Sequence, residues 1–230
     1  MTEFLAIHEL ALLQYLHILA MVFWLGGEWG VFQTSYKVVN SELTAPERLR
    51  HLDTVFRIDV LARVGIVSLL PLGLHMGYLW GLQPYGGVFL IVMWALWVLW
   101  VAITLQAFCD KMAKTKTIFG HLEDWSRYIL IPALLIVGTT SLMGIGPFEA
   151  GEGQKWYSIK LLIFGLAIII GLVLRYFLHS WPGIFGTLMN GPDVEAEMKL
   201  AKSIRASRRV AITYWITILA AGFIGAVKPV

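Results

Sequence analysis

Five side chains that could do chemistry recur at helical spacing near the start of the chain. Gln14, His17, Met21, Trp24 and Glu28 are separated by three, four, three and four positions. This spacing places them on one stripe of a single helix, which we expect to face the interior of a helix bundle. The stripe combines an imidazole, which can bind a metal, with a carboxylate, which can carry a proton.

A second histidine, His75, stands in the next apolar segment within the glycine ladder Gly73, Gly77 and Gly81. Glycines at this spacing let another helix, or a flat macrocycle, approach the backbone closely. If the two segments cross a membrane in opposite directions, a rise of about 1.5 Å per residue puts His17 and His75 at one level. Two facing imidazoles are what a b-type haem binds, so we expect both to ligate the iron of one haem b.

Ionisable side chains inside apolar segments are costly and usually functional. Lys160 lies one turn inside the start of the apolar segment 157–180. We expect it to pair with a haem propionate or to take part in proton transfer. The alternative is a lysine whose side chain extends to the lipid headgroups. Glu28 lies at a height similar to Arg63 and Arg175, which predicts an ion pair that locks the bundle. The functional alternative for Glu28 is a proton-carrying carboxylate. Lys160 and Glu28 are therefore the candidate catalytic residues.

The elements that must position these residues are membrane helices. Of the 230 residues, 58% are hydrophobic and 14% are charged, and there is one cysteine. A soluble domain has about a quarter charged residues, so a soluble enzyme, a disordered segment and a disulfide scaffold are excluded. A membrane span needs about 20 apolar residues, and six stretches qualify: about 9–36, 58–82, 87–109, 128–146, 157–180 and 209–227. We expect an all-α polytopic bundle of six transmembrane helices in one membrane domain, 1–230.

Basic residues predict the orientation. Most Lys and Arg residues lie in the segments 37–57, 110–127 and 181–209, whereas the opposite loops hold Lys155 and Lys228. By the positive-inside rule both termini lie outside and the three basic loops are cytoplasmic. We expect a multi-pass protein of a bacterial-type cytoplasmic (inner) membrane, with the lipid bilayer as a partner. Basic residues confined between apolar blocks do not indicate binding to nucleic acid.

Two of the basic loops carry signals for local helices. Thr44-Ala45-Pro46-Glu47 is typical of a capping box that opens a short helix. Another helix is predicted to begin at Pro192-Asp193, with apolar residues on one side: Val194, Met198, Ala201 and Ile204. Such a basic amphipathic helix would lie on the inner leaflet, and a solvated connector is the alternative.

The first two apolar segments carry residues of a known family. Leu16-His17-Ile18, followed by Trp24 and Gly27, resembles the first helix of the HemJ-type protoporphyrinogen oxidases and of the related copper-resistance CopD membrane domain. Arg57 and Pro71 look like residues of the second helix of that group.

The segment 157–180 extends this resemblance. Trp156-x-x-x-Lys160-Leu161, with an apolar run to Arg175, is similar to the Lys-bearing helix of the HemJ type. HemJ-type proteins bind haem b in the membrane and oxidise protoporphyrinogen IX. The resemblance therefore implies that His17 is a haem ligand and that Lys160 is a functional residue. The inserted segments 87–109 and 128–146 have no counterpart in that pattern.

The function favoured by these residues is that of a haem b membrane redox protein, linked to a porphyrinogen or to quinone. It would hold one haem and work as an oxidoreductase or as an electron-transfer subunit, associated with other membrane subunits or with itself. A second haem is not expected, because three further histidines fall at the membrane boundary: His51, His121 and His179.

Two other functions stay open at this point. In a CopD-like copper-handling protein, His17 with Met21, and His75 with Met76, would supply nitrogen and sulfur ligands. In a cofactor-free accessory subunit, one edge of the segment 87–109 would face lipid or dock to a larger complex, and the residues of that edge are Trp94, Trp97 and Trp100.

Overall fold

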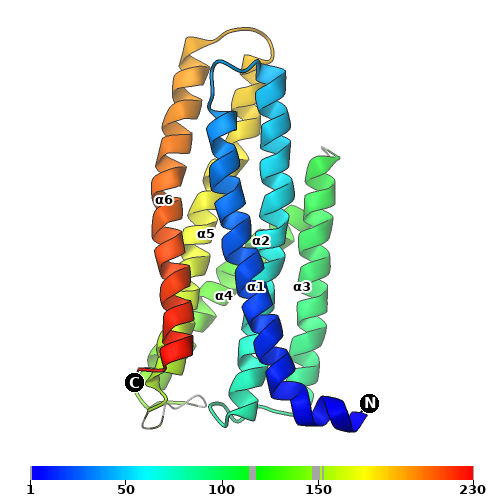
Figure 1. Ribbon diagram of the computed structural model, residues 1–230, viewed down its shortest axis with the longest axis vertical. Helices are drawn as coiled ribbons and strands as arrows, with labels where there is room; N and C mark the ends of the chain where they lie inside the picture. The colour runs from blue at the N-terminus through cyan, green and yellow to red at the C-terminus, as the bar shows by residue number, and fades with distance from the viewer. Residues whose placement is uncertain (1, 114–117, 147–150, 152, 230) are drawn as a thin grey trace.

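The computed structural model describes residues 2–113, 118–146, 151 and 153–229, with side chains described from His8 onward. These residues form six helices: α1 (Thr2–Val38), α2 (Ala45–Leu79), α3 (Val88–Met112), α4 (Phe119–Leu142), α5 (Lys155–Leu188) and α6 (Val194–Val227). Figure 1 shows an up-and-down bundle with both chain termini at the same end. The prediction of an all-α helix bundle is confirmed, and the described residues contain no strand.

Five of the helices, all except α2, are long and apolar enough to cross a membrane by length and composition. Large apolar side chains are also exposed on each of these five helices; on α3 they include Val88, Ile91 and Leu96. Water does not tolerate apolar surface of this extent on a monomer, whereas lipid does. The chain is therefore a multi-pass membrane protein.

The exception, α2, packs against both α1 and α3 and carries ionisable residues along its length. Arg48 and Asp59 are buried, and Asp59 pairs with Arg63 one turn further on. A helix that buries polar groups against its neighbours does not need a wholly apolar surface. The predicted segment 58–82 is helical as far as Leu79. Each of the six predicted segments therefore corresponds to one helix, and five of the six helices have the length and composition of a membrane span.

Four helices run well past the ends of α3 and α4. α1, α2, α5 and α6 have 37, 35, 34 and 34 residues, or roughly 51–56 Å of helix, whereas α3 and α4 have 25 and 24. In Figure 1 the upper ends of these four helices project beyond the green helix α3. They enclose a second core, here called the extension core: Val38, Leu52, Val55, Phe56, Leu178, Trp181, Ile184, Phe185, Leu188, Ala196, Leu200 and Ile204. The end of the bundle that carries the basic segments, the basic end, is thus a four-helix extension.

This extension corrects the expectation for the segment after Pro192-Asp193. The Asp193 side chain accepts a hydrogen bond from the N–H of Ala196 at 2.8 Å, and α6 then runs without a break into the membrane part. Leu200 and Ile204 are buried in the extension core, whereas Met198 is exposed. The prediction of a helix lying on the inner leaflet is wrong, because three neighbouring helices give this segment a protein surface to pack against.

The predicted capping box is confirmed at the start of α2. The Glu47 carboxylate accepts hydrogen bonds from the Thr44 backbone N–H at 2.9 Å and from its hydroxyl at 2.7 Å. The hydrogen bonds from the Thr44 hydroxyl and backbone N–H lower the pKa of the exposed Glu47 carboxyl from its ordinary value. The helix that it opens is not short, since it continues as α2 through the bundle.

Candidate functional site

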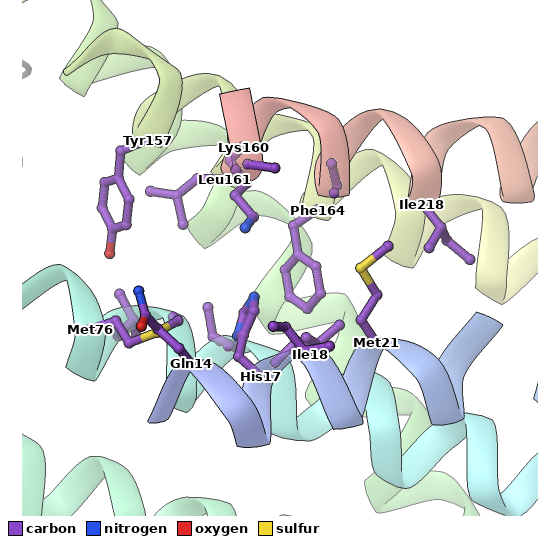
Figure 2. A pocket seen from close by; sticks show the side chains of 18 of the residues that line it. Gln14, His17, Ile18, Met21, Met76, Tyr157, Lys160, Leu161, Phe164 and Ile218 are labelled. Carbon is purple, nitrogen blue, oxygen red and sulfur yellow. The ribbon is translucent and has the colours of Figure 1, made fainter. Parts of the chain in front are cut away.

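A cavity of about 430 Å³ lies in the half of the bundle nearer the chain ends, between the pair α1–α2 and the pair α5–α6. Most of its walls are apolar, and the polar side chains that line it include Gln14, His17, Tyr157 and Lys160. Figure 2 shows these residues around the space between the two helix pairs. An apolar cavity with a few convergent polar groups is typical of a ligand site.

His17 points from α1 into this cavity (Figure 2). Its ring lies against Gly73 of α2, where a Cβ atom would be 3.5 Å from Cε1 of the histidine. The Nδ1 atom of His17 is buried and has no hydrogen-bond partner among the described residues. A buried ring nitrogen without a partner is costly, so this imidazole is suited to hold a ligand.

Two polar groups of α5 line the other side of the cavity. Lys160 points toward His17, and Tyr157 points toward Gln14 and Met76 (Figure 2). Glycines make room for both, because a Cβ at Gly77 of α2 would collide with the Tyr157 hydroxyl and one at Gly225 of α6 would collide with Lys160 Nζ. Within the described part of the chain, the buried Tyr157 hydroxyl has no hydrogen-bond partner and Lys160 forms no ion pair. The cavity therefore brings together His17, Tyr157 and Lys160, each of which has a polar atom without a partner among the described residues.

The other predicted ligand, His75, does not reach the cavity. Its Nδ1 accepts a hydrogen bond from Trp94 Nε1 of α3 at 3.3 Å, and its Nε2 lies 3.3 Å from the Glu9 carboxylate of α1. The next residue, Met76, does line the cavity. The structure does not bring His17 and His75 together, so the prediction of a facing imidazole pair is wrong. Depth in the membrane follows from position along a helix, but direction depends on rotation about its axis.

The tryptophans of α3 were expected to face lipid or a partner, and two of them face α2 instead. Trp94 donates to His75, and Trp97 Nε1 donates to the Ser68 hydroxyl at 3.1 Å. An indole N–H needs an acceptor when it leaves water, and α2 supplies both acceptors. These contacts dock α3 onto the bundle.

The predicted ion pair of Glu28 with Arg63 and Arg175 is also corrected. Both arginines bind Glu123 of α4 instead, at 3.2 and 2.6 Å, and Arg127 adds a third contact at 2.9 Å. The Glu123 side chain is completely buried, with 0% of its surface exposed. Glu28 forms neither an ion pair nor a hydrogen bond with the described side chains.

Sequence reasoning missed Glu123 because the apolar segment 128–146 starts after it. In the structure α4 begins at Phe119. Because the helix starts this early, Glu123 and Arg127 are part of it and are buried in the bundle. Arg127, counted among the loop cations, is therefore a buried partner of Glu123. The available signal was the spacing of the two residues, since opposite charges four positions apart share a helix face.

No group of three or more His, Cys, Asp or Glu side chains placed to hold a metal ion occurs among the described residues. A metal at His17 would thus have to arrive within a larger group or take ligands of other kinds. Comparisons with models of protein families, with curated proteins and with solved structures find no match for this chain. The cavity and its polar groups are what bears on function.

Proposed function

We propose that this protein binds one haem b in the cavity between the two helix pairs, with His17 as the iron ligand from this chain, and transfers electrons within the membrane. One observation carries the proposal. His17 has a buried ring nitrogen without a partner among the described residues, and its side chain lines an apolar cavity across from Lys160.

The residues of the cavity fit such a group. Apolar side chains such as Leu69, Phe164 and Ile218 form its walls. Gly73 of α2 has no side chain, which leaves space next to the His17 ring. Lys160 offers a cation that pairs with no described carboxylate, which suits a propionate. A b-type haem can use one imidazole as an iron ligand, one cation as a partner for a propionate, and apolar walls as contacts for its ring.

With His75 bound to Trp94 and Glu9, the second iron face would have no histidine from this chain. Haem with one histidine ligand serves proteins that bind or transform a molecule at the open face, and it supplies one-electron chemistry at iron. This favours an oxidoreductase that meets an apolar redox partner in the bilayer, a quinone or a porphyrin, over a bis-histidine electron carrier. The resemblance of α1, α2 and α5 to the HemJ type supports the same reading.

Copper handling is less well supported. Met21 and Met76 both line the cavity, but Figure 2 shows them on opposite sides of His17. Sulfur ligands that do not converge on the imidazole do not form a compact copper site. By the positive-inside rule we place the four-helix extension in the cytoplasm of a bacterial-type cell, with the haem cavity toward the outer side.

The test is an absorption spectrum of the purified protein, oxidised and then reduced with dithionite, together with iron and copper analysis. We expect a Soret band in the native protein and in His75→Ala, and its loss in His17→Ala. Carbon monoxide should shift the reduced spectrum, because His17 is the one histidine that lines the cavity and would hold the haem. Copper in place of iron, or equal haem content in native protein and His17→Ala, would overturn the proposal. A colourless protein that haem cannot reconstitute would favour an accessory subunit.

A further inference from the structure

Glu28 is a carboxylate inside the membrane part of α1 to which the haem site assigns no role. Two small cavities, of about 30 and 40 Å³, meet at this side chain. A water molecule needs roughly 10–15 Å³ of such space, so each cavity has room for about two. Water there would hydrate a carboxylate that has no partner among the described side chains.

The first cavity leads from Glu28 toward the basic end. Ser35, Ser207 and Arg208 line it together with Glu28. Arg208 Nε donates to the Ser35 hydroxyl at 2.9 Å, and its guanidinium lies 3.6 Å from the ring centre of Tyr36. Its Nη2 is buried and has no hydrogen-bond partner among the residues that the structure describes. Because the Tyr36 side chain is 50% exposed, this group of polar atoms borders the surface of the extension.

The second cavity joins Glu28 to the ion-pair cluster. The arginines of that cluster already have carboxylate partners in contact: Arg63 with Asp59 and Glu123, Arg127 with Glu123, and Arg175 with Glu123 and Asp124. Glu28 is a further carboxylate, and none of the described cations forms an ion pair with it. It can bind and release a proton without breaking an ion pair.

The side chains of Tyr214 and Trp24 separate Glu28 from the large cavity that His17 lines. The Tyr214 hydroxyl, which lines the second cavity, accepts a hydrogen bond from Trp24 Nε1 at 3.0 Å. Trp24 in turn lines the large cavity, and both side chains are 2% exposed. Charge is poorly screened across such a dry contact, so a charge in the large cavity acts on Glu28.

We propose that Glu28 takes up one proton from the basic end, through the cavity of Ser35, Ser207 and Arg208, when the group in the large cavity gains one electron. On re-oxidation the proton leaves by the same route. Because one proton accompanies each electron in both directions, the net charge of the buried region does not change. This step rests on the proposed function: the electron comes from the reduced form of the redox partner named there, a quinol in the case of a quinone or a porphyrinogen in the case of a porphyrin. The charged and titratable groups that face Glu28 are Asp59 and Arg63 of α2, Arg127 of α4, Arg175 of α5, and Arg208 and Tyr214 of α6.

The first measurement does not depend on haem. Infrared difference spectra between acidic and alkaline pH are recorded on cofactor-free protein, in the carbonyl-stretch region of protonated carboxylic acids. We expect one band to vanish in Glu28→Gln, to shift in Glu28→Asp and to persist in Glu42→Gln, whose side chain is exposed in a loop. Ser207→Val, which fills the route to the basic end, should slow the deuterium exchange of that band severalfold. Spectra of native protein and Glu28→Gln that coincide would overturn proton uptake at Glu28.

The second measurement uses the haem-loaded protein. The Glu28 band should appear on reduction, and the midpoint potential should fall as pH rises in native protein and in Glu42→Gln, but not in Glu28→Gln. A Glu28 band that responds to pH but not to reduction would overturn the coupling. If the protein holds no haem, the proposed function fails by its own spectrum, and the coupling fails with it, whereas the cofactor-free measurement still decides whether Glu28 exchanges protons.

Discussion

The indole N–H of Trp94 donates to Nδ1 of His75 across 3.3 Å, and this contact joins α3 to α2. It uses the ring nitrogen that a metal would otherwise take, while the other ring nitrogen faces Glu9. His75 of α2 thus fixes neighbouring helices. His17 of α1 faces the cavity and keeps a ring nitrogen for which the described residues supply no partner. Similar depth and similar chemistry do not give these two residues the same role.

Replacement of Trp94 by Phe should destabilise the protein without changing its cofactor content. The substitution keeps an aromatic ring but leaves Nδ1 of His75 without its donor, at a cost of about 1–2 kcal/mol. Thermal unfolding in detergent measures the loss, and Trp125→Phe, at a residue whose side chain is 64% exposed, is the control. A fall in haem content in Trp94→Phe would contradict the structural role assigned to His75.

Gly77→Ala should destabilise the protein because the new Cβ would lie 2.9 Å from Cζ of Tyr157 and closer still to its hydroxyl. Overpacking of this kind costs about 1–3 kcal/mol. Tyr157→Phe removes the hydroxyl, so the double variant should recover part of the loss. A double-mutant cycle on unfolding free energies measures the coupling, and additive effects would show that the two residues are not in contact.

Glu123→Gln should be the most damaging of these substitutions. It removes the buried charge that Arg63, Arg127 and Arg175 share, and an uncompensated buried charge costs about 3–5 kcal/mol. We expect a large loss of folded, monodisperse protein on size exclusion. Glu42→Gln, in an exposed loop, should behave as native. Equal yield and stability for both variants would refute a structural role for the cluster.

The capping box predicts a dependence of stability on pH. In the folded protein the Thr44 hydrogen bonds hold the pKa of Glu47 below its ordinary value of 4.5. The contribution of this carboxylate is therefore complete above that value and is lost as pH falls through the lowered pKa. The gap in unfolding midpoint between native protein and Glu47→Ala should be constant at neutral pH and should close in acid. A gap that widens with acid would have the wrong sign.

Much of the membrane architecture could be read from local pattern. Of the predicted stripe, His17, Met21 and Trp24 do line the cavity inside the bundle, and Gln14 lines it as an exposed side chain. A spacing of three and four residues is a property of one helix alone. Runs of apolar residues likewise located the helices, since the bilayer sets their minimum length. The capping box of α2 was equally local.

Local sequence pattern is enough to tell which residues share one helix face and how far along each helix they lie. It does not tell how each helix is rotated about its axis or which helices are neighbours. In the packed bundle, His75 contacts Trp94, and Arg63 and Arg175 pair with Glu123 and not with Glu28. Lys160 lies across the cavity from His17. The physical reason is that rotation and lateral pairing follow from the packing of several helices together, which no single segment encodes.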